Sequence, residues 1–128
     1  MSYGFSKTVS LPYEQAIEKV TEELKKEGFG VLTTIDVRDT LKKMLDVDFN
    51  KYIILGACNP PFAHKALVAE EQIGLLLPCN VIVYEKNGRT TVAAFDPMTM
   101  AALVENEALK AIAEEVTARL RRVINSLG

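Results

Sequence analysis

The spacing of apolar residues predicts two long amphipathic helices, one near each end of the chain. In residues 12–28 the apolar positions are Tyr13, Ala16, Ile17, Val20 and Leu24. After Asn106 they are Leu109, Ile112, Ala113, Val116, Leu120, Val123 and Leu127. Intervals of three and four residues place such side chains on one helical face. Pro12 and Asn106 suit helix starts, and Gly28 suits a helix end.

Five segments between and around these helices predict β-strands, because they are short and rich in β-branched and aromatic residues. They cover residues 3–9, 29–35, 51–57, 79–85 and 89–95. The last two are joined at Asn87-Gly88, a dipeptide typical of a type I′ hairpin turn. This hairpin requires at least one antiparallel pair of strands.

Three short helices are predicted from their start signals. Asp36 is a plausible N-cap for a helix that carries Val37, Leu41, Met44 and Leu45. Asn59 followed by Pro60 predicts a second helix that runs to about Ala69. Asp96-Pro97 begins a third helical piece. The order of elements therefore favours one α+β domain over residues 1–128, a two-layer sandwich whose mixed or mostly antiparallel sheet is packed by two long helices.

Two of the predicted strands lack the alternation of apolar and polar residues that is typical of a strand with one face in water. Residues 52–55 and 81–84 are consecutive apolar or aromatic residues, so both faces of these strands carry them. If Ile53, Leu55, Val81 and Val83 face the helices, Tyr52, Ile54, Ile82 and Tyr84 face the other way. A patch of this size is rarely left in water on a monomer, which favours a homodimer.

Charge and composition narrow the class of protein. Apolar residues make up 48% and charged residues 25% of the chain, and 15 basic against 17 acidic residues leave a net charge of −2. We therefore expect no nucleic-acid partner. The densest basic cluster is Arg119, Arg121 and Arg122, interpreted as the solvated end of the last helix. With no secretory or membrane-spanning pattern we expect a cytoplasmic protein without a membrane partner, and two cysteines exclude a disulfide framework.

Cys58, Asn59 and Pro60 form the most suggestive corner of the sequence. A cysteine directly before a helix start lies near its free N–H groups and positive dipole end, which favour a thiolate or a small bound anion. On the alternative interpretation, Asn59-Pro60 merely starts a helix and Cys58 is a small buried apolar residue. If Cys58 is exposed, it should alkylate faster than Cys79, which opens a strand after Pro78.

His64 and Cys79 complete the set of candidate ligand-binding residues with Cys58, Asn59 and Pro60. Spacings of six and fifteen residues between Cys58, His64 and Cys79 match no zinc signature, and three ligands are too few for a closed structural site unless two chains pool them. Position 63, not His64, should lie back over Cys58. A Cys58–Cys79 disulfide and a Cys58–His64 hydrolase are conceivable but weakly supported.

Other chemistry has little support in the sequence. Glu70, Glu71, Asp46 and Asp48 are interpreted as solvated helix ends and turns. The nucleotide-binding, nucleophile-elbow and zinc-protease motifs are missing, so we expect no cofactor and no catalytic residue of a familiar type.

Two segments, GACNPPFAHKAL (residues 56–67) and IGLLLPCNVIVYE (residues 73–85), together with the LPYEQAIEKV opening, resemble a bacterial and archaeal family catalogued as domain of unknown function 302. The resemblance covers nearly the whole chain. It implies an α+β fold similar to the sheet-and-helix arrangement of TATA-binding protein and a tendency to dimerise, and it implies no established activity.

The sequence thus favours a homodimeric module that binds a small molecule or a protein partner, without catalysis of a familiar type. The alternative is a thiol- or metal-dependent protein centred on Cys58. A defined apolar pocket with an inert thiol would favour the binding module.

Overall fold

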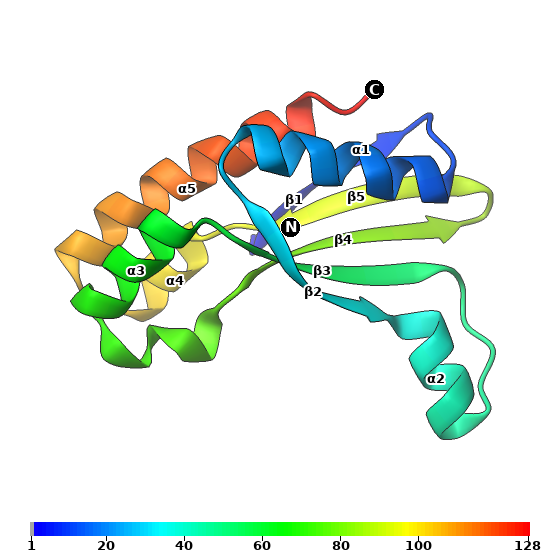
Figure 1. The fold of residues 1–128 in the computed structure, drawn as a ribbon, viewed down its shortest axis with the longest axis horizontal. Helices are drawn as coiled ribbons and strands as arrows, with labels where there is room; N and C mark the ends of the chain where they lie inside the picture. The colour runs from blue at the N-terminus through cyan, green and yellow to red at the C-terminus, as the bar shows by residue number, and fades with distance from the viewer. Residues whose placement is uncertain (1) are drawn as a thin grey trace.

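All five predicted strands are present in the computed structural model, which describes residues 2–128. They are β1 (Gly4–Val9), β2 (Gly30–Asp36), β3 (Tyr52–Cys58), β4 (Cys79–Lys86) and β5 (Arg89–Phe95). They form a sheet of order β1-β5-β4-β3-β2, in which each neighbouring pair is antiparallel (Figure 1). Asn87 and Gly88 both have positive φ, 54° and 74°, as a type I′ turn requires. The α+β prediction is confirmed, with a wholly antiparallel sheet.

The two long helices are also confirmed. They are α1 (Tyr13–Lys26) and α5 (Glu107–Asn125). The Asn106 side chain accepts a hydrogen bond from the Leu109 amide at 3.2 Å and so caps α5. Gly28, one residue beyond the C-cap Glu27, has a φ of +88°, which a glycine adopts without steric cost.

Four shorter helices complete the fold: α2 (Val37–Leu45), α3 (Pro60–Ala69), the 3-10 helix η1 (Glu71–Leu76) and α4 (Met98–Leu103). Asp36 caps α2 as predicted, accepting from the Asp39 amide at 2.9 Å. The sequence analysis missed η1, because six residues with three-residue turns show no amphipathic period.

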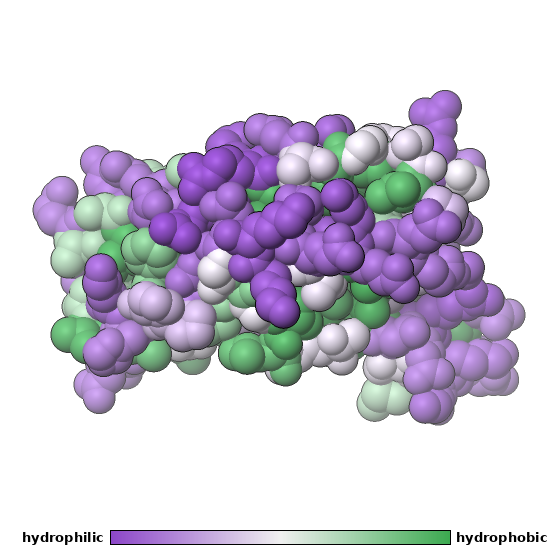
Figure 2. Space-filling model, turned by 45° about the horizontal axis from the view of Figure 1, so that its top comes forward, coloured by the Kyte–Doolittle hydropathy of each residue, from purple (hydrophilic) through white to green (hydrophobic). Residues whose placement is uncertain are grey.

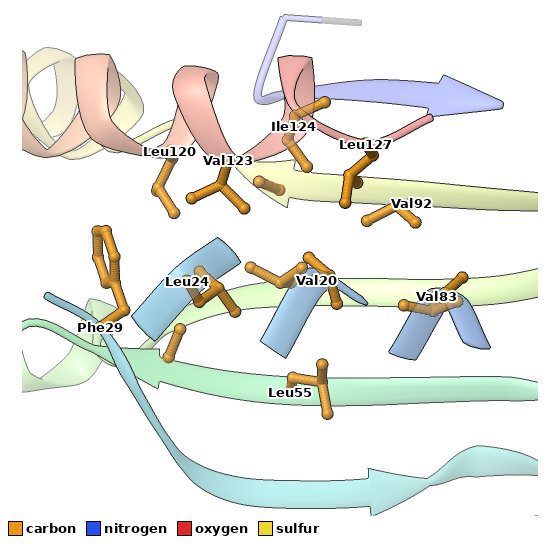
Figure 3. Close-up of a cluster of buried hydrophobic side chains, with 14 of the residues drawn as sticks. Val20, Leu24, Phe29, Leu55, Val83, Val92, Leu120, Val123, Ile124 and Leu127 are labelled. Carbon is orange, nitrogen blue, oxygen red and sulfur yellow. The ribbon is translucent and has the colours of Figure 1, made fainter. Parts of the chain in front are cut away.

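The core lies between the sheet and the two long helices. Figure 3 shows Val20 and Leu24 of α1 and Leu120 of α5 pointing toward the sheet, where Val83 and Val92 meet them. These five side chains are completely buried. The predicted stripes therefore face the core, and each residue packed there gains about 1.5–3 kcal/mol from leaving water.

The side of the molecule formed by α1 and α5 presents mainly hydrophilic residues to solvent, whereas hydrophobic groups are visible at the end that α3 and α4 form and along the lower edge of the view (Figure 2). Exposed there are Val68, Leu75 and Leu103. Within residues 2–128, no helix has the length and apolar character needed to cross a bilayer.

The face of the sheet turned away from α1 and α5 is here called the outer face. The register places twelve residues on it in three rows: Ser6, Thr8, Thr33, Ile35, Tyr52, Ile54, Gly56, Asn80, Ile82, Tyr84, Thr91 and Ala93. A further, charged pair, Lys86 opposite Arg89, lies on the same face next to the hairpin turn. As predicted, Tyr52, Ile54, Ile82 and Tyr84 share this face, and each is partly exposed. The rings of Tyr52 and Tyr84 stack at 5.4 Å.

Candidate functional site

An apolar cavity of about 340 Å³ lies where the sheet, α3 and α5 meet. Within residues 2–128, eighteen residues line the cavity. None of them carries a carboxylate, an amine, a guanidinium or an imidazole. Its walls include Ala57 of β3, Phe62 and Ala66 of α3, Met100 of α4 and Val116 of α5. The cavity therefore suits an uncharged guest better than an ion.

The cavity exists because small side chains occupy positions where larger ones would fill the space. Ala57, Ala63, Ala66 and Ala113 all line it, on β3, α3 and α5. Alanine at these points keeps the helical faces apolar while leaving the volume between them empty. The sequence shows the alanines but not that they meet around one space.

A β-bulge shapes the rim of the cavity. The pairing of β2 with β3 shifts between Val31 and Thr33, so Leu32 has no partner in the register. Its side chain is 67% exposed and lines the cavity. Bulges of this kind redirect a side chain beside a site and have no simple signature in a single sequence.

At the same rim, Gly56 allows the side chains of Thr33 and Pro78 to pack closely against the backbone of β3. A Cβ added to this residue would lie 2.1 Å from Oγ1 of Thr33 and 2.9 Å from Cγ of Pro78. Thr33 and Pro78 both line the cavity, so a larger residue at position 56 would push on its wall. The need for glycine here is steric, from packing across the sheet rather than from backbone conformation.

The two cysteines lie at the same end of the sheet and both line the cavity, as free thiols. The register pairs Cys79 with Ala57 rather than with Cys58, so the geometry gives no support to the disulfide. Burial, with a smaller contribution from the neighbouring Cys58, raises the pKa of the Cys79 thiol to about 11. Cys58 is partly exposed, which keeps the predicted order of alkylation in place as a prediction.

The helix start at Asn59 and Pro60 is where the sequence predicted it, but its chemistry differs. Asn59 occupies the N-cap position, yet its side chain caps no amide of the described chain. Pro60 and Pro61 fill the first two helical positions and have no N–H to offer an anion. The expected array of donors beside Cys58 is therefore mostly missing, a consequence of two adjacent prolines that the sequence analysis overlooked.

Asn59 instead joins two helices. It is 6% exposed, and its amide donates to the Glu27 carbonyl at the end of α1, 3.2 Å away. Arg119 of α5 donates to the same oxygen at 2.9 Å, and its guanidinium lies over the ring of Phe62, 5.1 Å from the centroid. Part of the basic cluster thus ties α1, α3 and α5 together around the cavity, rather than forming only a solvated face.

His64 and Pro60 lie outside the cavity. Both are exposed, whereas Ala63 and Cys58 both line the cavity. Among the residues that the structure describes, no three His, Cys, Asp or Glu side chains gather into a group that could hold a metal. Of the acidic candidates, Asp46 and Asp48 both pair with Lys42, at 3.0 and 3.2 Å. Three of the five candidate residues thus meet at one cavity: Cys58, Asn59 and Cys79.

These features define a class: an antiparallel α+β sandwich with an alanine-lined apolar cavity at one end of its sheet. The model of the family "Domain of unknown function DUF302" matches residues 5–127, and the chain belongs to that family. The chain is also similar to a solved structure, the uncharacterized conserved protein DUF302 from Bacillus stearothermophilus, with 32% identity, a TM-score of 0.92 and complete coverage of both chains. A comparison with curated proteins gives no match.

Proposed function

We propose that the protein is a homodimeric binding module whose ligand is a small, uncharged and mainly apolar molecule. The observation that carries the proposal is the cavity beneath α3, with its eighteen lining residues and its lack of fixed charge. An apolar cavity with a few polar groups is the usual form of a small-molecule site. The function proposed is binding, without catalysis.

The size of the cavity limits the ligand. A volume of about 340 Å³ is at the lower end of the ~300–1,000 Å³ range of ligand pockets. At ~30 Å³ for each water-sized group, it holds a molecule of about ten non-hydrogen atoms. A fused pair of rings or a short hydrocarbon chain is of this size.

The polar groups of the cavity indicate how such a ligand would be oriented. The hydroxyl of Thr33 and the thiol of Cys58 belong to partly or fully exposed residues at the rim. The inner wall is formed by buried residues such as Ala57, Ala66 and Ala113. A ligand with one polar end would therefore place that end toward Thr33 and its apolar body beneath α3.

The homodimer is part of the same proposal and rests on a different observation. Apolar and aromatic residues occupy both faces of β3 and β4, and those on the outer face are only partly buried. A second copy of the chain would remove them from water.

The thiol-centred alternative has weaker support. A nucleophilic thiol needs an adjacent base held by a third group, or an array of donors. His64 is exposed and does not line the cavity, and the two prolines remove donors from the start of α3. Cys79 is kept protonated by burial at neutral pH.

The proposal is tested by filling the cavity. The fluorescent probe 1-naphthylamine, a fused pair of rings that matches the size of the cavity, is titrated into the purified protein, and native mass spectrometry of fresh protein reports any co-purified molecule. We expect saturable binding that Ala63→Leu and Ala113→Leu weaken by about tenfold or more, because leucine occupies the ligand's volume.

Ala111→Leu is the matched control, since Ala111 lies on α5 two residues from Ala113 but is exposed and does not line the cavity. It should leave binding unchanged. Probe binding that survives both filling substitutions would show that the cavity is not the site, and an absence of binding by the native protein would contradict the proposed ligand class.

A further inference from the structure

Helix α2 differs from the other helices in its packing. It carries the apolar residues Val37, Leu41, Met44 and Leu45 on a nine-residue helix, but none of the nine described residues is buried. Met44 is 77% and Leu45 66% exposed. In Figure 1, α2 stands away from the other helices, beside the ends of β2 and β3 and at the opposite end of the sheet from α3. A helix this short is marginal in water without packing, and the contacts of α2 with β2 and β3 of its own chain leave Met44 and Leu45 exposed.

The polar side of α2 does not need such a partner. Lys43 pairs with Asp39 at 3.0 Å, and Lys42 pairs with Asp46 at 3.0 Å, each one turn apart. These ion pairs lie in water, where each contributes little to stability. The part of α2 that still lacks a packing partner is therefore its apolar side.

The connection after α2 contacts the outer face of the sheet. Phe49, in the connection from α2 to β3, lies 6.2 Å from the ring of Tyr52, which in turn stacks on Tyr84. Ile35, the last outer-face residue before α2, lies opposite Ile54 and is 48% exposed. We call the twelve outer-face residues of the three rows, together with Met44, Leu45 and Phe49, the docking surface.

The docking surface lacks charge. None of its fifteen described residues is acidic or basic. Charged residues lie at its margins: Lys86 and Arg89 at the hairpin end of the same sheet face, and Arg38, Lys42 and Asp48 around Phe49. Solvent-facing positions of an antiparallel sheet are ordinarily polar and often charged, whereas the centres of interfaces are depleted of charge. In a twofold contact each residue lies near the same patch on its partner, so an uncharged patch avoids repulsion from its own copy.

The area also fits a second copy. Five strands spaced by ~4.8 Å and about six residues long at ~3.3 Å each cover roughly 480 Å². The side of α2 adds about 140 Å², from a length of ~14 Å and a width of ~10 Å. This flat area approaches the ~800 Å² of accessible surface that each partner contributes to a standard interface. The accessible surface is larger than the flat area, because the side chains make the face uneven.

From these observations we infer that two copies of the chain associate face to face through the docking surface, with the apolar side of each α2 packed on the other copy. The two sheets stack about 10 Å apart, which gives a four-layer assembly with helices on both outsides. The inference rests on the homodimer of the proposed function and adds the surface that forms it. It does not depend on the ligand.

Sedimentation equilibrium over a range of protein concentrations tests it. We expect the native protein to reach twice the 14.1 kDa of one chain at micromolar concentration. Ile35→Glu and Leu45→Glu each place a charge in the contact and should weaken the dimer by roughly tenfold or more. Both native residues are exposed in the single chain, so folding, checked by circular dichroism, should be unaffected.

Leu103→Glu is the matched control. Leu103 and Leu45 are similarly exposed, at 68% and 66%, but Leu103 lies on α4 at the other end of the sheet. It should leave the dimer intact. Hydrogen exchange adds a second readout: the amides of α2 should exchange slowly at high concentration and rapidly on dilution to the monomer.

The outcomes separate the two proposals. A native protein that stays at 14.1 kDa would overturn both the homodimer and this surface. A native dimer that neither Ile35→Glu nor Leu45→Glu weakens would overturn this surface alone and leave the homodimer standing. If Leu103→Glu weakens the dimer as much as Ile35→Glu and Leu45→Glu do, the docking surface is also overturned.

Discussion

Two apolar regions of this molecule are built from side chains of different size. Beneath α1 and α5, large residues such as Val20, Leu24 and Leu120 meet the sheet and are completely buried. Beneath α3, alanines line the space between the helices and the sheet, and about 340 Å³ of it stays empty. The amphipathic pattern is continuous along α5 through both regions. The pattern therefore determines which face packs inward, while side-chain volume determines whether the space behind it is filled.

The largest expected effect comes from shortening a side chain in the filled region. Leu24→Ala should lower the free energy of unfolding by about 2–5 kcal/mol, because the surrounding core cannot close over the lost volume. Leu67→Ala, on the cavity wall and 43% exposed, should cost less than about 1 kcal/mol. Urea unfolding of both variants measures the difference. Equal losses would contradict the contrast between the two regions.

A smaller effect is expected from enlarging an alanine in each region. Ala16 is packed in the filled core and Ala113 lines the cavity, and each is 1% exposed. Ala16→Leu should cost about 1–3 kcal/mol through overpacking. Ala113→Leu should be neutral or should stabilise by up to about 2 kcal/mol, as cavity filling commonly does.

Thermal unfolding, with urea unfolding at one temperature, compares the two leucine variants. A loss of stability at Ala113 as large as that at Ala16 would mean that the cavity wall cannot accept a larger side chain. Ala111→Leu, on the exposed side of α5, controls for the change in helix propensity.

Local signals predicted the fold well because each acts over a few residues. Asp36 and Asn106 accept hydrogen bonds from the first turns of α2 and α5, and Asn87-Gly88 has the backbone of its turn type. The two apolar stripes lie where their period placed them. The outer-face residues were likewise predictable, because side-chain alternation follows from strand geometry alone.

The candidate site was predictable only in part, because it depends on contacts between distant segments. Cys58, Asn59 and Cys79 were identified by residue type, and they do line one cavity. The alanines of α3 and α5 were invisible as a group, since their meeting depends on how the two helices cross. The bond from Asn59 to the Glu27 carbonyl joins residues 32 positions apart and replaces the expected cap.

The smallest effect we predict concerns Cys79, where the filled core meets the cavity. Burial raises the pKa of its thiol from 9.0 to about 11. A pKa that is higher in the folded than in the unfolded chain contributes stability that is fully present below pH 9 and is lost as the pH rises through 11. At pH 10 the loss should be about 1 kcal/mol.

Other groups also titrate in this range, among them Tyr13, whose pKa burial raises to about 12. The measurement is therefore a difference: the free energy of unfolding between pH 8 and 11 in the native protein, in Cys79→Ala and in Cys58→Ala. Removing Cys79 should flatten the alkaline decline, whereas removing the partly exposed Cys58 should leave most of it. The slope is the readout, because Cys79→Ala also loses packing at every pH. Identical slopes in the native protein and Cys79→Ala would contradict the raised pKa and indicate that water reaches the thiol at the start of β4.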